Sequence, residues 1–154
     1  MNKDDTSGLT QLGSNVTEYK YNEPSVHILE GFKNQHPDAD YWVNFQFHEF
    51  TSLCPKTGQP DTASVFVEYV PGDMILETKS VKLYFFAYRE HGAFMESITN
   101  KILRDFVAVC GPKQMKVTMK FAPRGGIKLR VEAFYHHRNG FCFHPQGKSG
   151  RPNK

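Results

Sequence analysis

A cysteine and an aspartate stand seven residues apart in a stretch rich in residues that form turns. Cys54 is followed at once by a proline, and Asp61 is preceded by the run Gly-Gln-Pro. A loop between two strands can present both side chains to one pocket. A cysteine thiolate is a strong nucleophile, and a carboxylic acid within hydrogen-bond reach of a substrate can donate a proton to it. This spacing would suit covalent catalysis, with Cys54 as the nucleophile and Asp61 as the general acid.

The thiol of Cys54 needs a nearby positive charge or hydrogen-bond donors if it is to ionise near neutral pH. Lys56 and the hydroxyl groups of Thr51 and Ser52 are local candidates. The alternative is a structural role, in which Cys54 fills space in the core and Asp61 caps a turn, because free cysteines are usually buried. The loop by itself leaves both interpretations open.

Residues 77–84 form a second cluster that combines charges, hydroxyl groups and an aromatic ring. Lys79 and Lys82 are three residues apart, so on a helix they would share a face and could bind phosphates, while Tyr84 could line a flat ring. Paired lysines more often mark a solvated face. Glu96 could interact with the dipole of the helix that it begins, or accept hydrogen bonds from two adjacent N–H groups of a purine-like base.

Two other patterns do not match the binding motifs that they resemble. Gly147-Lys148-Ser149 echoes the end of a phosphate-binding loop, but position 142 is not glycine and no strand-to-helix context surrounds it. His136, His137, Cys142 and His144 fit no common zinc spacing. We therefore expect no metal site.

Composition indicates one globular, cytoplasmic domain. The 154 residues are 39% hydrophobic and 23% charged, and they contain no apolar run long enough to cross a membrane. The three cysteines are odd in number and form no CxxC pair, which favours free thiols in a reducing compartment. From Pro112 onward there are ten Lys or Arg residues and a single acid, Glu132, which favours an anionic ligand on that side.

The apolar pattern predicts two antiparallel hairpins separated by two helices. Residues 1–39 show little periodicity and are expected to be irregular, and residues 141–154 form a basic tail. Between them lies one domain, 40–140, of the order β-β-α-α-β-β, which is an α+β fold. Strands are expected at 41–48, 62–70, 115–121 and 127–131, and helices at 80–88 and 94–109. Sheet edges of this kind could be closed against other copies in a ring.

The loop and the cluster together resemble the paired motifs of NADPH-dependent 7-cyano-7-deazaguanine reductases. The first motif is Ser52-Leu53-Cys54-Pro55 with Gln59-Pro60-Asp61, and the second is Glu77-Thr78-Lys79-Ser80-Val81-Lys82-Leu83-Tyr84. The resemblance runs from about Tyr41 to Ile127 and includes His91-Gly92, Glu96 and the segment Phe121-Ala122-Pro123-Arg124-Gly125-Gly126-Ile127.

The resemblance implies a tunnelling fold, in which subunits join their sheets into a multimeric barrel and bind purine- or pterin-like rings where they meet. Single-module members form a decamer of two pentameric rings. The implied reaction reduces the nitrile of 7-cyano-7-deazaguanine to an aminomethyl group, with NADPH as co-substrate and a covalent thioimide on Cys54, on the pathway to the tRNA nucleoside queuosine. No membrane partner and no direct nucleic-acid partner are expected.

The resemblance also implies roles for individual residues. Cys54 and Asp61 are the catalytic pair. The deazaguanine ring is held by Leu76, Glu77, Thr78 and Glu96. NADPH is contacted by Lys79, Ser80, Lys82, Tyr84 and Arg124, of which Arg124 suits bidentate binding of a phosphate. The family pattern has His-Glu where this chain has Met95-Glu96, so the orientation of the ring or a proton path could differ.

Other functions remain open at this point. A related amidinotransferase shares the Cys and the Asp and acts on tRNA, but it lacks the NADPH motif, so residues 79–84 argue against it. A zinc-dependent cyclohydrolase would need a Cys/His ligand set that the sequence does not provide. A non-catalytic RNA-binding module would use the basic C-terminal hairpin, and its binding would depend on salt and not on Cys54.

Overall fold

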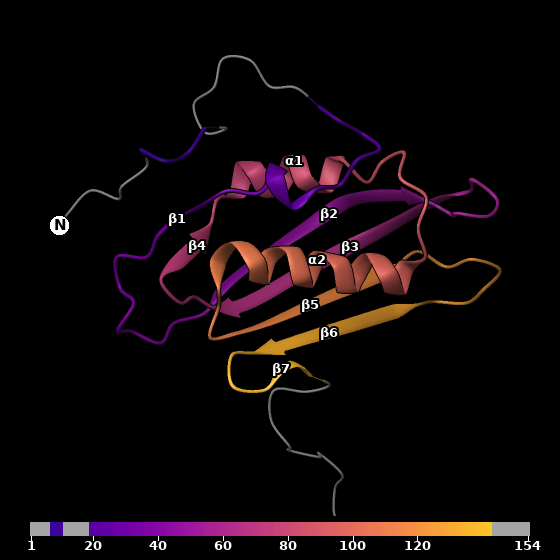
Figure 1. Ribbon diagram of the computed structural model, residues 1–154. Coiled ribbons are helices and arrows are strands. Elements are labelled where there is room, and N and C mark those ends of the chain that lie inside the picture. The colour runs from indigo at the N-terminus through magenta and orange to yellow at the C-terminus, as the bar shows by residue number, and fades with distance from the viewer. Residues whose placement is uncertain (1–6, 11–18, 143–154) are drawn as a thin grey trace, which may run out of the picture.

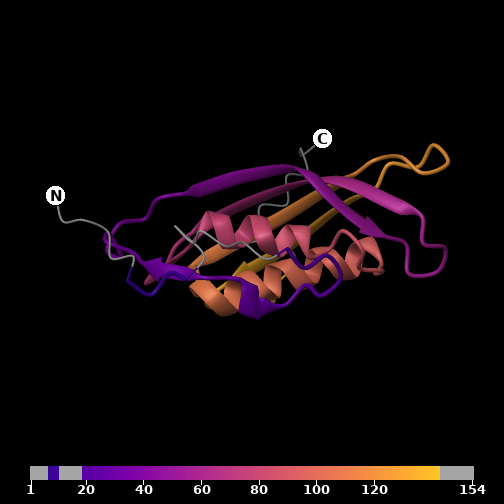
Figure 2. The ribbon, with the colours of Figure 1, turned by 90° about the horizontal axis from the view of Figure 1, so that it is seen from above.

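The computed structural model describes residues 7–10 and 19–142 and shows a five-stranded antiparallel sheet with two helices on one face (Figure 1). Seen from above, both helices lie on the same side of the sheet (Figure 2). The α+β class predicted from the sequence is therefore confirmed. In chain order the elements are η1 (Val26–Ile28), β1 (Gly31–Lys33), β2 (Val43–Leu53), β3 (Pro60–Val70), β4 (Met74–Leu76), α1 (Thr78–Phe86), α2 (Met95–Cys110), β5 (Gln114–Phe121), β6 (Arg130–His136) and β7 (Gly140–Cys142).

The two predicted hairpins are present and lie side by side. β2 pairs with β3 and β5 pairs with β6, and β3 pairs with β5 to give the strand order β2-β3-β5-β6-β7. β1 and β4 form a separate two-stranded ribbon. β3 lies between β2 and β5, so Asp61 lies opposite Ser52 of β2, and Ala63 lies opposite Phe121 of β5.

An irregularity in β2 changes which of its side chains face the helices. Val43, Phe45 and Phe47 pack against the core, but the register shifts after Phe47, and beyond the shift Phe50 and Ser52 are the buried residues. A bulge of this kind re-aims the side chains that follow it. The regular alternation of residues 41–48 predicts the first half of the strand only, and the strand in fact continues to Leu53.

Both predicted helices are confirmed, with ends that differ by one or two residues. α1 begins after Glu77, whose side chain accepts hydrogen bonds from the backbone N–H groups of Lys79 and Ser80. This is the arrangement of a helix N-cap. α2 ends at Cys110 and is followed by Gly111, whose φ of 48° lies in the left-handed region that favours glycine.

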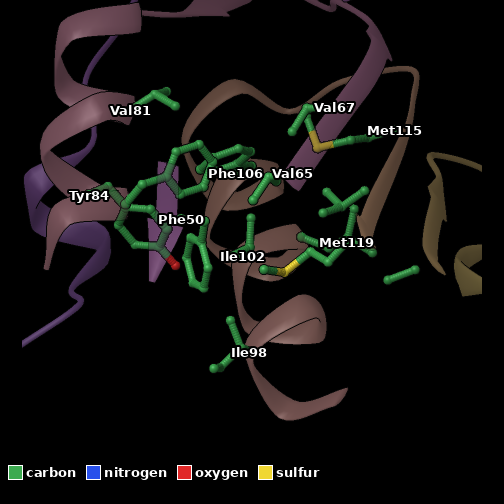
Figure 3. Close-up of a cluster of buried hydrophobic side chains, with 14 of the residues drawn as sticks. Phe50, Val65, Val67, Val81, Tyr84, Ile98, Ile102, Phe106, Met115 and Met119 are labelled. Atoms are coloured by element: carbon green, nitrogen blue, oxygen red, sulfur yellow. The ribbon is translucent and has the colours of Figure 1, made fainter. Parts of the chain in front are cut away.

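The core fills the space between the sheet and the two helices (Figure 3). Alternate residues of β3 are buried, and α2 faces them with residues spaced three or four apart. The buried side chains include Ala63, Val65, Val67 and Tyr69 from β3, Val81, Tyr84 and Phe85 from α1, Ile98, Ile102, Leu103 and Phe106 from α2, and Met115, Val117 and Met119 from β5. This packing holds the N-terminus of α2 in a fixed place at one end of the sheet.

Several boundaries differ from the predicted ones. Residues 26–33, predicted as irregular, contain η1 and β1, because β1 pairs with β4. The last long strand begins at Arg130 instead of 127, and β7 crosses the predicted start of the tail. Residues 1–6, 11–18 and 143–154, with His144 and Gly147-Lys148-Ser149, lie outside the described residues. Across the described part of the chain, no helix combines the length and the apolar character needed to cross a membrane.

Candidate active site

Three chain connections meet at one end of the sheet: the β2–β3 connection, the segment from α1 to α2, and the β5–β6 connection (Figure 1). They border an open cavity of about 260 Å³. It is lined by Cys54, Pro55, Asp61, Ala93, Phe94, Met95, Glu96, Ala122, Arg124, Ile127 and Leu129. The structure therefore brings together four of the predicted site residues, Cys54, Asp61, Glu96 and Arg124.

Cys54 occupies the first position of the tight connection after β2. Its N–H donates to the carbonyl of Gln59 at 2.8 Å, and its carbonyl accepts from the N–H of Gly58 at 2.9 Å, so the loop closes on itself. Gly58 has a φ of 68°, a conformation that favours a residue without a Cβ. The turn-forming residues of the loop thus hold a half-buried thiol at the wall of the cavity.

Hydrogen-bond donors surround the sulfur of Cys54. The hydroxyl of Thr57 lowers the pKa of Cys54 most, and the backbone of Lys56 and Thr57 lowers it further. Burial opposes them by raising the pKa, and Arg124 lowers it by the least. Together these effects bring the pKa of Cys54 to about 6. The thiolate therefore predominates at neutral pH. Lys56 acts through its backbone and not through its ammonium group, and the buried hydroxyl of Ser52 has no hydrogen-bond partner among the described residues.

Asp61, the second residue of β3, is only 4% exposed. Its two carboxylate oxygens accept hydrogen bonds from Nε and Nη2 of Arg124, which makes a bidentate ion pair. Both oxygens therefore act as acceptors, as in an ionised carboxylate. The hydrogen bond to Asp61 is also the main reason why the pKa of Arg124 is raised above its ordinary value.

The turn that follows Arg124 directs it towards Asp61. Arg124 and Ile127 exchange backbone hydrogen bonds of 3.0 and 2.9 Å across Gly125-Gly126. Both glycines have positive φ values, 53° and 84°, as a two-residue hairpin turn of this type requires. The N–H of Ala122 also donates to the backbone of β3 at 2.9 Å. The segment that carries Arg124 is thus attached to the strand that carries Asp61.

The segment between the two helices brings the start of α2 next to the loop after β2. The N–H of Leu53 donates to the carbonyl of His91 at 3.0 Å, and the N–H of Ala93 donates back to the carbonyl of Leu53 at 3.1 Å. Gly92 lies so close that a Cβ on it would stand 3.3 Å from the Cα of Pro55. A glycine at this position therefore permits the close approach of the two segments.

α2 supplies another wall of the cavity through Met95 and Glu96, which lie in its first turn. Met95 is half-buried, and Glu96 is exposed. Two large apolar side chains of the lining, Phe94 and Ile127, are 64% and 74% exposed. They give the mouth of the cavity an apolar edge, which suits contact with a flat ring or with another protein surface.

The other predicted site residues lie elsewhere, at β4 and along α1, which begins at the opposite end of the sheet (Figure 1). They are Leu76, Glu77, Thr78, Lys79, Ser80, Lys82 and Tyr84, and none of them lines the cavity. Within one subunit, the structure therefore divides the predicted site into two groups.

Most polar atoms of this second group are used within the fold. Glu77 caps α1, at 2.7 Å from the N–H of Lys79 and 2.6 Å from that of Ser80. The hydroxyl of Ser80 donates to the carbonyl of Glu77 at 2.7 Å and accepts from the N–H of Glu30 at 3.0 Å. Leu76 is 2% exposed and belongs to the core, while Thr78 is exposed at the start of α1.

Tyr84 and the two lysines occupy different surroundings. The hydroxyl of Tyr84 donates to Asp105 at 2.7 Å and lies 3.0 Å from that of Tyr88, and burial raises the pKa of Tyr84 far above its ordinary range. Lys82 is exposed, with its ammonium group 5.9 Å from the ring centre of Phe86, and Lys79 is half-buried. The ligand contacts predicted for these residues stay predictions.

Comparisons with known proteins identify the family. The family model of QueF-like proteins matches residues 60–140. The NADPH-dependent 7-cyano-7-deazaguanine reductase of Alkaliphilus metalliredigens is 46% identical over 82% of this chain and 75% of its own. Those of Streptococcus thermophilus and Neisseria meningitidis serogroup B are each 45% identical, over 88% and 87% of this chain and 81% and 85% of theirs. The chain belongs to the QueF family. The resemblance stated from the two motifs is confirmed.

A solved structure of the QueF family also matches. The archaeosine synthase QueF-Like in its apo form superposes with a TM-score of 0.59 and 25% identity, over 64% of this chain and 96% of that one. Its identity to this chain is well below the 45–46% of the reductases from the three bacteria.

Two features of the site were not predicted from the sequence: the pairing of Arg124 with Asp61, and the effect of Thr57 on the thiol. The pairing of Arg124 with Asp61 depends on β3 lying next to β5, and the two predicted hairpins leave that neighbour order open. Thr57, the main influence on the thiol, stands three residues after Cys54 in a tight turn. A hydroxyl at that spacing could bond back to the start of the turn, and this is the signal that could have identified it.

Proposed function

We propose that the protein reduces the nitrile group of 7-cyano-7-deazaguanine to the aminomethyl group of 7-aminomethyl-7-deazaguanine, using two molecules of NADPH, in the cytoplasmic biosynthesis of queuosine. Membership in the QueF family supports the proposal. The observation that carries it is that Cys54, with its lowered pKa, shares a cavity with the buried carboxyl group of Asp61. A preformed thiolate can attack a nitrile carbon, which is a poor acceptor of hydride on its own.

The first chemical step is addition of the Cys54 thiolate to the nitrile carbon. A C–S bond forms, one π bond of the nitrile breaks, and the nitrogen takes a proton from Asp61. The product is a covalent thioimide, whose C=N bond is easier to reduce. NADPH, when bound, supplies one hydride for each of two reductions. The first hydride adds to the carbon and the Cys54 thiolate departs, which leaves an imine; the second hydride adds to the same carbon, and a proton from solvent completes the amine.

The cavity and its surroundings fit the substrate and the co-substrate. Glu96 lines the cavity with a carboxylate that can accept hydrogen bonds from the N–H groups of the deazaguanine ring. The apolar edge formed by Phe94 and Ile127 suits flat rings. Arg124 provides positive charge for phosphates at the cavity, and the exposed Lys82 and the half-buried Lys79 provide it on α1, away from the cavity of the same subunit.

We also propose that a second copy of the chain completes the site in a tunnelling-fold barrel, a decamer of two pentameric rings. The residues proposed for ligands fall into two groups at opposite ends of one subunit, and contact between neighbours in a ring would join them. In such an assembly, the segment Leu76-Glu77-Thr78 would come next to the ring, with Thr78 as its exposed residue, and the buried Ser80 and Tyr84 would shape the co-substrate site from α1. Light scattering of the purified protein tests the assembly, and a monomer that turns over at full rate would contradict it.

The reaction itself is tested with purified protein, the nitrile substrate and NADPH. We expect two NADPH to be oxidised for each amine formed, and intact-protein mass spectrometry to detect a covalent adduct carrying the mass of the substrate. Cys54→Ala is expected to abolish both the oxidation and the adduct. Adduct formation or turnover that survives in this variant would reject the mechanism.

Cys110→Ala is the matched control, because it removes a thiol of the same chain that lies outside the cavity. We expect it to lower the melting temperature, since Cys110 is 1% exposed in the core, and to keep the adduct. Loss of the adduct in Cys110→Ala at a temperature where the protein is folded would show that the reactive thiol has been misassigned.

A further inference from the structure

Arg124 has two anionic partners, one expected from the family resemblance and one observed in the structure. The family resemblance assigns it to a phosphate of NADPH, whereas in the structure its Nε and Nη2 donate to both oxygens of Asp61. A bidentate contact of this kind uses two parallel donors of the planar group. Two of the five N–H donors of the group are thus taken by Asp61, and a phosphate that drew the guanidinium outward would remove them from the carboxylate.

Asp61 cannot act as a proton donor while it is held in this way. A general acid must carry a proton, and here both oxygens of Asp61 accept hydrogen bonds from Arg124. The carboxyl group is 4% exposed, and its neighbours in the cavity wall include Ala122 and Leu129. Removing the guanidinium would leave a buried charge without a partner, and uptake of a proton relieves that cost.

The geometry points to Arg124 as a positioning residue that passes from Asp61 to an anionic group of the bound co-substrate, so that Asp61 takes up the proton that it later gives to the substrate nitrogen. This inference rests on the proposed reductase function. When Arg124 leaves, the Asp61 carboxylate takes a proton from a hydronium ion or a buffer acid of the solvent. When the Cys54 sulfur then bonds to the nitrile carbon, one C–N π bond breaks and that proton moves to the nitrogen.

The position of Arg124 allows this exchange by movement of its side chain alone. The side chain is 33% exposed, while that of Asp61 is 3% exposed, so the guanidinium can reach solvent and the carboxylate stays inside. The backbone of Arg124 is fixed by its two hydrogen bonds with Ile127. Binding of the co-substrate would thereby be coupled to protonation of Asp61. Adduct formation would then be faster when the co-substrate site is filled.

The test measures the rate of adduct formation on Cys54 with and without NADP⁺, which carries the phosphates of the co-substrate but has no hydride to give. In the unchanged protein we expect NADP⁺ to speed up adduct formation about tenfold or more, as gain of a general acid would. In Arg124→Gln we expect the same rate with and without NADP⁺, because Asp61 is no longer held. Arg124→Lys keeps the charge without the planar fork and should retain part of the acceleration.

Lys128→Gln is the matched control, since Lys128 is an exposed base on the same β5–β6 connection that does not line the cavity. It removes the same charge and should keep the full acceleration. A purely structural role for Arg124 would lower the rate equally in both conditions, whereas the exchange removes only the response to NADP⁺. Thermal melting of each variant, with Arg124→Lys as the milder change, identifies any loss of folding.

Three outcomes decide the matter. An unchanged rate in the original protein, with NADP⁺ shown by calorimetry to be bound, overturns the exchange, and so does acceleration that persists in Arg124→Gln. If either of these two results is found while NADPH is turned over normally, the exchange is rejected and the proposed reductase function stands. Absence of both adduct and NADPH oxidation in the original protein rejects the proposed function itself, and the exchange with it.

Discussion

Two cysteines at opposite ends of the molecule have opposite environments. Cys54 follows β2 at the cavity, where hydrogen bonds led by that of Thr57 lower its pKa to about 6. Cys110 closes α2 at the far end, where it is 1% exposed and donates to the carbonyl of Phe106 at 3.2 Å. There burial raises the pKa of Cys110 to about 12. The same side chain is made reactive by donors at one end and inert by desolvation at the other.

The polar groups at the two ends differ in the same way. At the cavity, Glu96 is exposed and Arg124 is partly exposed, so both can meet a ligand. At the start of α1, Glu77 and Ser80 are buried, and their oxygens bond to the backbone around them. Within one subunit, the polar groups at the cavity are therefore open to a ligand, whereas those of Glu77 and Ser80 hold the start of α1 in place.

The largest expected effect is the contrast in alkylation between the two thiols. At pH 7 Cys54 should be mostly thiolate, whereas the thiolate fraction of a thiol with a pKa of about 12 is only about one in 10⁵. Brief treatment with iodoacetamide, followed by peptide mapping, should label Cys54 and leave Cys110 unlabelled. The rate of labelling should rise with pH through a midpoint near 6 and then level off. Labelling of both at similar rates in the folded protein would remove the contrast.

Thr57→Val should raise the pKa of Cys54 and so reduce the difference in reactivity between Cys54 and Cys110. The hydroxyl of Thr57 is the largest influence on Cys54, and valine keeps its shape without the donor. The midpoint of alkylation should move up from about 6 towards the ordinary range of a thiol, so labelling at pH 6 slows several-fold. Thr57→Ser, which keeps the hydroxyl, is the control. Equal midpoints for valine and serine would show that the backbone donors alone set the reactivity.

A change at the start of α1, at the end of the molecule away from the cavity, should affect stability and not the pKa of Cys54. Glu77→Ala removes the cap of α1 and leaves two backbone N–H groups without their acceptor, at a cost of roughly 1–2 kcal/mol in the free energy of unfolding. A melting temperature lower by about 3–8 °C would be the corresponding result. Glu77→Gln keeps a side-chain oxygen and should lose less. A changed midpoint of Cys54 alkylation in Glu77→Ala would show that the two ends are coupled.

Local patterns in the sequence predict the elements of the fold well and their meeting points poorly. The spacing of Phe94, Ile98, Ile102 and Phe106 predicts α2 because a helix buries one stripe. The alternation in residues 115–121 predicts β5 for the same kind of reason. The bulge in β2 has no such signal, because it depends on how β2 lies against β3 and the helices.

The same limit applies to the candidate site. The thiol and the carboxyl group can be singled out from residue type and spacing, and the cavity contains both. The partner of Asp61 could not, because Arg124 lies 63 positions further along the chain and meets Asp61 only through the pairing of β3 with β5. Tyr84 shows the converse case, since its place in a motif does not reveal that it is 0% exposed in the core.

The smallest expected effect concerns Met95, which lines the same cavity as Cys54 and stands where the family resemblance led us to expect a histidine. Met95→His would add a group that is positively charged below a pH of about 6.5. A positive charge near the sulfur favours the thiolate, so the midpoint of alkylation should fall slightly below the value near 6. Met95→Leu, which has a similar size and no charge, should leave it unchanged. If both variants match the original protein, position 95 acts on the cavity only through its shape, and the reactivity of Cys54 is set by the turn that carries it.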